Sequence, residues 1–583
     1  MLAKKINKIT NRQVAIIFAA LGLVVFFTGL SSPFQGDDFT QIVNNIPVHS
    51  ISHIRLFFEG GTQYAGNGLT PLSGIYYRPL LSTVYSLLYS LFGAHTIAFH
   101  LFQLALYISS AFLLYLIFKF SFKTPLSLFL ALIFLVHPLN SQVAFSISSM
   151  QEVLFFFFGI LGMWLLLSKS TNKGLITVVA CFLLSLLSKE TAIVFVLVAA
   201  VYLFWFNRER LTRFIYYMAG PLAIYLVLKL NALGIHGRSH VGPIDNLNVY
   251  GRLLDMPSIF LFYITKFIFP WKLATGYYWT HPSFSVSYFL LPLVIDIAII
   301  GAFVYLGLKI NKKLKKTQFY TYLFFAIWAA IGMLPNLQII PLGLTVSESW
   351  FYFTMAGLLG MLGVIYLAYP IRHFKGVKRE WIIVLCIVLI GALGVRTAVR
   401  GHDWDNIIGL AYKDAAASPS DYSADNIVAS SLIVQGKYNE SQTYTMKSIN
   451  TYPEFYNYYT LGVSSGFLGN YSAASKAYTK SLTYSSDNEL VFDNLGELTL
   501  VHGTASGDYL FLTGALKIYP KDSTLWMYLS ILEYRLGFPT TAKAAITNAI
   551  KTGEVPQFIY NGIVNQKHFT ITLTDLNTKV KVQ

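Results

Sequence analysis

Two adjacent carboxylates, Asp37 and Asp38, follow directly after the first long apolar run of the sequence. Acidic side chains are costly to place beside lipid, and one of them can act as a general base that removes a proton from a hydroxyl. The charge of one carboxylate also raises the pKa of its neighbour, which helps one of the pair to accept a proton. A solvated helix cap at a membrane boundary also explains such a pair, so the choice between these two interpretations depends on other residues.

Further ionisable residues occur in five short segments that fall on the same side of the predicted membrane domain. The segments are Tyr76 to Leu80 around Arg78, His137 to Asn140, Ser188 to Glu190 around Lys189, Pro270 to Tyr278 around Lys272, and Ser347 to Tyr352 around Glu348. Arg binds phosphate through its forked guanidinium, and Lys binds it as a point charge. Each segment alone also has a structural explanation: a helix cap at His137, a snorkelling side chain at Lys189, or an ion pair at Glu348.

The elements that must position these residues are apolar runs, which recur through the first 399 residues. Only 12% of the 583 residues are charged and 55% are hydrophobic, which excludes disorder and argues against a purely soluble protein. The runs are 14–30, 97–118, 125–136, 151–168, 174–187, 190–206, 213–233, 288–308, 318–334, 350–368 and 381–399. We expect an all-α polytopic bundle with about 11 spans. One further stretch, 257–270, must turn back or lie in the interface.

The distribution of charge predicts the orientation of this bundle. The net charge of +16 would first suggest a nucleic-acid ligand, but the first 399 residues contain 29 Lys and Arg against 11 acids, and the remainder is nearly balanced. With the N-terminus inside, 20 of those 29 cations fall in inner loops, as the positive-inside rule requires. Orientation in the membrane therefore explains the charge, and no nucleic acid is expected. A cleaved signal peptide over 1–30 is the less favoured interpretation, because its apolar run is long.

After residue 400 the composition becomes polar, and a 34-residue period appears. Gly469, Gly503 and Gly537 follow it, as do Ser481, Ala515 and Ala549. The period predicts about four helix-turn-helix repeats over 419–554, stacked as a solenoid with a concave groove. We therefore predict a membrane domain over 1–400, with a first external loop at about 31–96, and a repeat domain over 401–583 outside the membrane. An ordinary helical domain with a chance period is the alternative.

In their order along the chain, these segments resemble the tetratricopeptide-repeat O-mannosyltransferases and their bacterial relatives, in the type C superfamily of membrane glycosyltransferases. The resemblance is carried by Asp37-Asp38, Tyr77-Arg78-Pro79-Leu80, Phe99-His100, His137-Pro138 with Glu152, Lys189-Glu190, and Glu348 with Tyr352. The chain departs from the family pattern at Asn140, Gln142, Gly276 and Ser349. The last two positions lack an Asp and an Arg of the pattern, which leaves the identity of the donor open.

The resemblance implies a polyprenyl-phosphate-linked sugar as donor and an acceptor on the external face. Asp37 or Asp38 would be the general base, while Arg78, Lys189 and His137 would bind the donor phosphate. Supporting roles fall to Tyr77, His100, Glu152, Glu190, Glu348 and Tyr352. No cofactor is certain. Carboxylates and phosphate could share a divalent metal, but the spacing requires none and no metal ligand is predicted.

Three functions follow from these features. The favoured one transfers mannose or another hexose to Ser or Thr of a polypeptide held in the repeat groove. A second keeps the fold and donor but takes an envelope glycan or lipid as acceptor. The third is a transporter or a membrane-anchored assembly scaffold, which the scarcity of ionisable residues inside the spans disfavours. Compact external loops indicate a bacterial plasma membrane.

Overall fold

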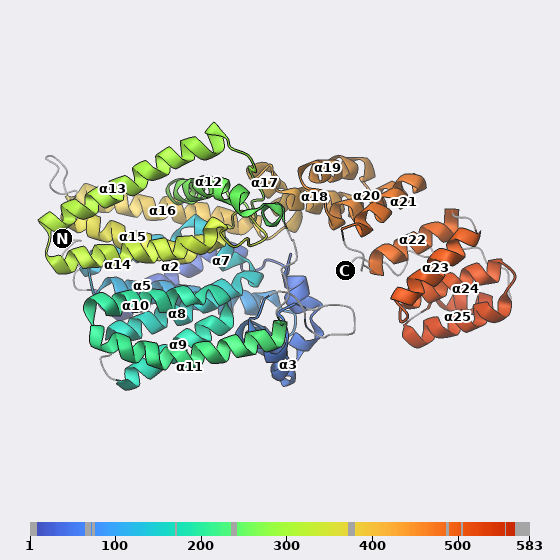
Figure 1. The fold of residues 1–583 in the computed structure, drawn as a ribbon, viewed down its shortest axis with the longest axis horizontal. Helices are drawn as coiled ribbons and strands as arrows, with labels where there is room; N and C mark the ends of the chain where they lie inside the picture. Colours follow the sequence, from blue (N-terminus) through green and yellow to red (C-terminus); the bar gives the residue numbers. More distant parts are fainter. Residues whose placement is uncertain are drawn as a thin grey trace. The chain divides into compact units, whose positions relative to one another are not determined.

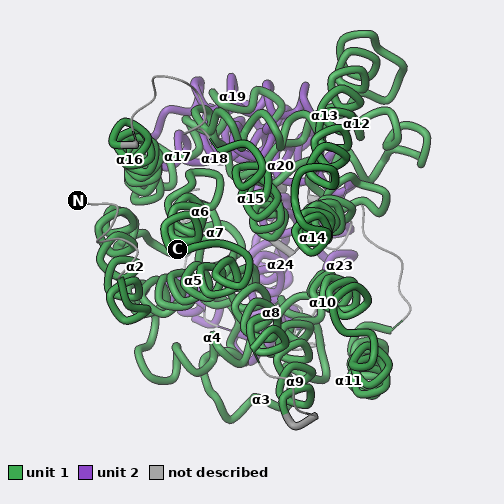
Figure 2. Tube along the Cα trace, turned by 90° about the vertical axis from the view of Figure 1, so that its left-hand side faces the viewer, with its two compact units in different colours: residues 1–420 green, residues 421–583 purple. Residues whose placement is uncertain are grey.

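The computed structural model describes residues 9–63, 72, 76–168, 172–234, 242–370, 379–484, 489–502, 505–553 and 555–565. Helices dominate this part of the chain, and only isolated β-bridges accompany them, so the all-α prediction is confirmed. The chain divides into two compact units, residues 1–420 and 421–583 (Figures 1 and 2). Two sets of predicted features lie outside the described residues. They are Gly503 of the repeat and seven of the 20 cations predicted for inner loops, namely Lys4, Lys5, Lys8, Lys169, Arg372, Lys375 and Lys378.

Unit 1 is a bundle of long apolar helices, which Figure 2 views nearly end-on. Among the described residues, eight helical segments are long and apolar enough to cross a membrane, or nine if one pair bent by 49° counts as one span. The eight contain α2 (Asn11–Phe26), α5 (Thr96–Phe118), α8 (Met150–Ser168), α11 (Arg208–Leu233), α13 (Leu291–Lys313), α14 (Lys316–Met333), α15 (Phe351–Ala368) and α16 (Arg379–Asp403). The bent pair is α6 (Thr124–Val136) with the short segment Pro138–Phe145.

The remaining predicted runs are helical but short. α9 (Asn172–Ser188) has 17 residues and α10 (Ile193–Phe206) has 14, so whether they cross the membrane stays a prediction. The segment predicted to turn back at 257–270 lies largely in one continuous helix, α12 (Val249–Ile268), even though that helix contains Pro257. Because it does not turn back, an interfacial position remains the prediction for it. α4 (Pro79–Phe92) is a further short apolar helix.

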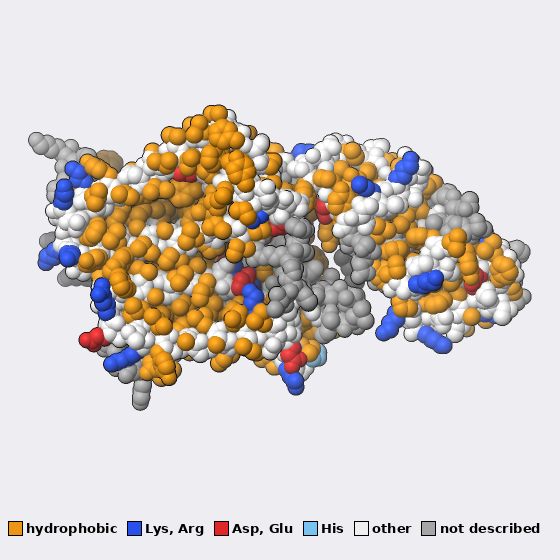
Figure 3. Space-filling model, viewed as in Figure 1, with side chains coloured by type: hydrophobic (Ala, Val, Ile, Leu, Met, Phe, Trp, Pro, Cys, Tyr) orange, Lys and Arg blue, Asp and Glu red, His pale blue; other side chains and the backbone are white. Residues whose placement is uncertain are grey.

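Close helix contacts and aromatic packing hold unit 1 together. At Gly357 an added Cβ would lie 2.5 Å from the Ala329 backbone nitrogen, so only glycine lets α14 and α15 approach so closely. Tyr352 is fully buried in this core, with ring centroids 4.4 Å from Phe156 and 4.9 Å from Phe134. Figure 3 shows apolar side chains over most of the visible face of unit 1. Lys and Arg gather at the end where Figure 1 places the turn between α13 and α14.

Unit 2 consists of consecutive antiparallel helix pairs. They are α18 (Tyr422–Val434) with α19 (Tyr438–Thr451), α20 (Phe455–Phe467) with α21 (Tyr471–Leu482), α22 (Glu489–His502) with α23 (Ala505–Ile518), and α24 (Ser523–Arg535) with α25 (Pro539–Thr552). α26 (Gln557–Val564) follows. Gly436, Gly469 and Gly537 each lie between the two helices of a pair at φ of 74°, 75° and 82°, which L side chains rarely adopt. This shared turn explains the predicted glycine period.

The boundary between the units lies after Ser420, later in the chain than the change of composition at residue 400. The helix between these positions, α17 (Ile407–Ala417), belongs to unit 1. Its Asp414 is buried and binds two groups of that unit, Arg400 and Thr275. The first polar helix after the last apolar run is therefore part of the bundle.

Candidate active site

The Asp pair lies in a tight turn after α2, between Gly36 at φ 57° and a short helix at Phe39–Val43. Asp38 is buried, and its Oδ2 accepts a hydrogen bond from the backbone N–H of Gln35 at 2.9 Å. Burial raises the pKa of the Asp38 carboxyl to about 7, against hydrogen bonds from Gln35 and Ser148 that lower it; the nearby charge of Asp37 adds to the rise. The structure thus assigns most of this rise to burial, where the sequence suggested the neighbouring charge.

Asp37 differs from its neighbour because it is open to solvent. The surrounding protein atoms nevertheless displace enough water to raise the pKa of its carboxyl, and the positive charge of Arg78 partly opposes this effect. A solvent-accessible carboxylate with a raised pKa is suited to take a proton from a substrate. Asp38, whose Oδ2 holds the turn together, is suited to position it.

Four ionisable residues that the sequence singled out line one open cavity. They come from three places in the chain: Arg78 directly precedes α4, Glu152 lies in the first turn of α8, and Lys189 with Glu190 connects α9 to α10. The walls between them include Tyr76, Phe155, Asn336, Trp350 and Phe353. We call Arg78, Glu152, Lys189 and Glu190 the acid-paired pocket.

Each cation of the acid-paired pocket has its own carboxylate. The Arg78 Nε and Nη2 donate to the two Glu190 carboxylate oxygens at 3.2 and 3.0 Å, and Lys189 Nζ pairs with Glu152 Oε1. The guanidinium of Arg78 also lies over the Tyr76 ring, 4.1 Å from its centroid. Burial alone would lower the pKa of Arg78, but the charge and hydrogen bonds of Glu190 hold it above its ordinary value. The pocket therefore holds two basic side chains in fixed positions, each paired with its own carboxylate.

The other predicted residues serve the surrounding structure. His137 Nδ1 accepts from the N–H of Leu139 at 3.2 Å, and its Nε2 lies 3.0 Å from the Phe267 carbonyl oxygen. Both ring nitrogens are therefore occupied, which leaves none for a donor phosphate. Tyr77 donates to the Phe58 carbonyl, and His100 Nε2 lies 3.0 Å from the Ser32 carbonyl oxygen. Tyr352 is a core residue, as described above.

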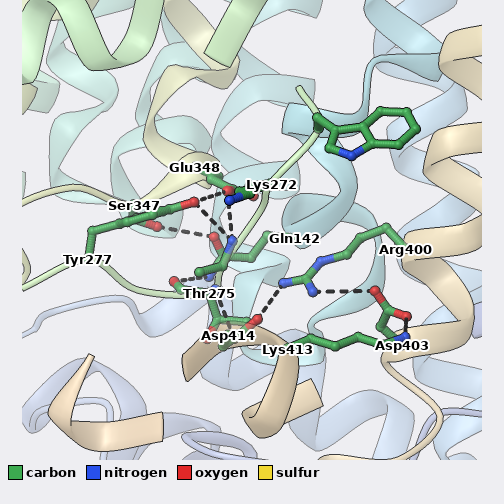
Figure 4. Close-up of polar contacts among 12 residues, drawn as sticks. Gln142, Lys272, Thr275, Tyr277, Ser347, Glu348, Arg400, Asp403, Lys413 and Asp414 are labelled. Atoms are coloured by element: carbon green, nitrogen blue, oxygen red, sulfur yellow. Dashed lines mark hydrogen bonds and ion pairs between the residues drawn. The ribbon is translucent and has the colours of Figure 1, made fainter. Parts of the chain in front are cut away.

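Glu348 lies in a second polar network, around the loop that follows α12 (Figure 4). Glu348 Oε1 accepts from the Tyr277 hydroxyl at 2.7 Å and from the Ala274 N–H at 3.0 Å. Asp414 Oδ2 accepts from the Thr275 hydroxyl at 2.6 Å, and its Oδ1 pairs with Arg400 at 2.8 Å. These contacts join the loop at 272–277 to the turn that precedes α15 and, through Asp414 of α17, to Arg400 of α16.

Sequence reasoning missed Arg400 and Asp414, because they come from separate segments and neither belongs to a recognisable motif. It singled out the segment Pro270 to Tyr278 but gave Thr275 no role. Gln142, noted only as a departure from the family pattern, also joins this network. Its Nε2 donates to the Thr275 carbonyl at 3.1 Å, and its Oε1 accepts from the Ser347 hydroxyl at 3.2 Å. Among the described residues, no group of three or more His, Cys, Asp or Glu side chains is arranged to hold a metal ion.

Part of the chain that contains this pocket matches a known protein family. Residues 78–230 match the family described as dolichyl-phosphate-mannose-protein mannosyltransferase, and this range contains all four residues of the acid-paired pocket. No curated protein matches the chain. The match identifies the chain as an enzyme of the membrane glycosyltransferase class.

Two solved structures are similar over much of the chain. One is ArnT from Cupriavidus metallidurans bound to undecaprenyl phosphate, at 15% identity and a TM-score of 0.35 over 80% of this chain and 79% of that one. The other is the Cut9-Hcn1 hetero-tetramer of APC/C, at 13% identity and a TM-score of 0.25 over 84% of each chain. At these TM-scores neither likeness bears on the function.

Proposed function

We propose that this membrane glycosyltransferase moves a sugar from a polyprenyl-phosphate carrier to Ser or Thr hydroxyls of proteins on the external face, with Asp37 as general base. The observation that carries the proposal is the cavity lined by Arg78 and Lys189, with the accessible carboxylate of Asp37 close enough to Arg78 to feel its charge. The family description, which names a lipid-phosphate-linked mannose and a protein acceptor, supports the choice of donor and acceptor.

The chemistry requires one proton transfer and one substitution at carbon. Asp37 takes the proton of the acceptor hydroxyl, whose oxygen then bonds to the anomeric carbon while the bond from that carbon to the phosphate oxygen breaks. The electron pair of that bond stays with the polyprenyl phosphate. A positioned base contributes roughly 10²–10⁴-fold to the rate of such a step. Fixed positive groups near the leaving phosphate contribute further because they need not reorganise.

Arg78 and Lys189 are the groups proposed to face that phosphate. Their pairing with Glu190 and Glu152 fixes each side chain in one place while leaving both beside the cavity. The donor is a phosphodiester with a single negative charge. Such a group does not require several unpaired cations, so it suits a pocket in which each cation already has a carboxylate partner. His137 is omitted from this role because both of its ring nitrogens are occupied.

The proposed acceptor depends on unit 2. Stacked helix pairs of this kind offer an extended surface for a polypeptide, and we keep the predicted arrangement with the N-terminus inside and unit 2 outside a bacterial plasma membrane. An envelope glycan or lipid acceptor is the alternative. Mass spectrometry of envelope proteins with and without this chain separates the two, because only a protein acceptor leaves a hexose-sized mass on Ser or Thr that disappears with the gene.

The assignment of the base is tested by three single variants in a transfer assay with a polyprenyl-phosphate sugar and a peptide acceptor. Asp37→Asn should lower the rate by at least roughly 10²-fold. Asp38→Asn keeps an oxygen for the Gln35 N–H and should lose less. Glu59→Gln is the matched control, because Glu59 is an exposed carboxylate of the same loop, and its ion pair within the described residues is with the exposed Arg55. If Asp37→Asn transfers sugar as fast as Glu59→Gln, Asp37 is not the base.

A further inference from the structure

A second group of cations lies at the same end of unit 1, apart from the acid-paired pocket. It comprises Lys266 near the end of α12, Lys272 in the following loop, and Arg396 and Arg400 in the last turns of α16. We call these four residues the cation cluster. Burial lowers the pKa of Lys266 most, and the charge of Glu348 opposes this. Lys272, Arg396 and Arg400 are near enough for their charges to lower the pKa further.

The cation cluster is short of carboxylates. Arg396 Nε and Nη2 both donate to the Trp271 carbonyl oxygen at 3.1 and 2.7 Å, and Lys266 Nζ donates to the carbonyl of Lys272. Lys266 further lies over the rings of Phe262 and Tyr277, at 5.1 and 5.5 Å. Lys266 and Arg396 thus donate their hydrogen bonds to neutral carbonyl oxygens, whereas in an ion pair they would donate to a carboxylate.

The acids nearby are already engaged. Glu348 accepts from Tyr277 and Ala274, Asp414 from Arg400 and Thr275, and Asp403 from Arg400 and Lys413. Among the described residues, the carboxylates that bond to this group and its loop are Glu348, Asp414 and Asp403. Counting Lys413 with the cluster, five cations face these three carboxylates, an excess of two positive charges. Like charges held together without counterions raise the free energy of the folded protein. An anion that binds here relieves that cost.

Apolar side chains are exposed beside the cluster. Phe269 and Trp271 are 71% and 76% exposed, and Val395 and Val399 project from α16 at 66% and 54%. Basic groups beside exposed aromatic and aliphatic side chains are typical of a membrane boundary, where the charges meet lipid headgroups and the apolar groups meet acyl chains. The anion that fits this place is therefore the phosphate of a lipid.

We propose that the cation cluster binds the phosphate monoester of the lipid carrier after the sugar has been transferred, and so holds the product on its way back to the bilayer. A donor with a sugar attached is a diester with one negative charge, whereas the released monoester carries about −1.5 to −2 at pH 7. The balanced pocket suits the donor, and the excess of two positive charges suits the product. The identity of the lipid rests on the proposed function; the preference for a lipid phosphate monoester rests on the cluster alone.

The test measures binding of a polyprenyl phosphate to the full chain in detergent, without acceptor or sugar. The triple variant Lys266→Gln, Lys272→Gln, Arg396→Gln is compared with wild type and with a matched control, Lys309→Gln, Lys312→Gln, Lys313→Gln, which removes three cations from the far end of α13. Arg400 is left in place because it is buried and ion-paired. We expect the triple variant to bind at least about tenfold more weakly, a loss of about 1.4 kcal/mol, and the control to bind as wild type does.

Two further arms identify the ligand chemistry. Phosphatidylglycerol, a diester with one negative charge, should bind weakly to wild type and lose little in the triple variant. Equal losses for both lipids would overturn the preference for a monoester. If inorganic phosphate binds as tightly as the polyprenyl phosphate, the proposal that the ligand is a lipid is wrong.

Unchanged binding of the polyprenyl phosphate in the triple variant would overturn the site itself. The single variant Lys272→Gln is the control for misfolding, because that side chain is exposed. It should also weaken binding of the polyprenyl phosphate. No sugar is transferred in this assay. A chain that proves inactive in transfer can therefore still bind the monoester, so this proposal and the proposed function fail separately.

Discussion

The acid-paired pocket and the cation cluster both set basic side chains at one end of unit 1, but they match charge in opposite ways. In the pocket, Arg78 and Lys189 each have one carboxylate partner and are about as buried as core residues. In the cluster, Arg400 takes the available acids, while Lys266 and Arg396 bond to carbonyl oxygens.

This difference separates two uses of a buried or half-buried cation. A cation paired with its own carboxylate is held in one geometry, which is what a group that orients a substrate needs. A cation without a carboxylate keeps its charge available for an anion, at a cost to the unliganded protein. The two regions should therefore respond oppositely when single charges are removed.

The largest expected effect is in the pocket. Glu190→Gln leaves Arg78 buried without its counter-ion, which should cost about 3–5 kcal/mol of stability. The measurement is thermal unfolding followed by a thiol-reactive dye, which labels Cys181 when unfolding exposes it; Cys181 is buried in the native protein. Glu59→Gln removes an acid from an exposed pair and should cost less than about 1 kcal/mol. Equal effects of the two substitutions would show that the pocket does not depend on its pairing.

A somewhat smaller effect is expected from pH at Asp38. Its carboxyl has a pKa of about 7 in the folded chain and near 4 when unfolded, so the folded state holds the proton more tightly. Stability therefore falls as pH rises from about 4 to 7, by up to about 4 kcal/mol relative to Asp38→Asn. The difference in melting temperature between Asp38→Asn and wild type should thus grow in favour of the variant between pH 5 and pH 8. A constant difference would mean that Asp38 titrates at an ordinary pKa.

The sequence predicted the pocket better than the cluster for a physical reason. Glu152, Lys189 and Glu190 each lie at the end of a predicted apolar run, and adjacent antiparallel helices bring such ends together at the same membrane boundary. Arg78 was singled out by its motif, and it directly precedes the apolar helix α4. The predicted runs were confirmed as helices for the same reason, since apolar length is a local property of the chain. The 34-residue glycine period likewise reports a local turn at positive φ.

What the sequence could not predict depends on contacts between distant segments. Asp414 was placed with the polar remainder of the chain, yet it bonds to Thr275, 139 residues earlier. His137 was interpreted as a phosphate ligand, but Phe267 approaches from α12 and occupies its Nε2.

Asp414 pairs with Arg400 of the cation cluster, and removing its charge tests how the cluster is held in place. Asp414→Asn keeps an oxygen for the Thr275 N–H but loses the charge that pairs with Arg400, so it should cost about 2 kcal/mol in the same unfolding assay. Asp405→Asn is the control, because Asp405 sits nearby and pairs only with the exposed His402 among its charged neighbours in the described chain. A cost no larger than that of Asp405→Asn would show that the 272–277 loop is held by other contacts.

The smallest expected effect has the opposite sign and decides the comparison. Lys266→Gln removes one of several like charges while its amide can still donate to the Lys272 carbonyl, so the unliganded protein should be unchanged or more stable by up to about 1 kcal/mol. Adding a polyprenyl phosphate should then raise the melting temperature of wild type more than that of the variant, because binding to the folded state stabilises in proportion to affinity. The same lipid added to Lys312→Gln should act as it does on wild type. If Lys266→Gln instead destabilises the unliganded chain as Glu190→Gln does, Lys266 is a structural cation and the two regions match charge in the same way.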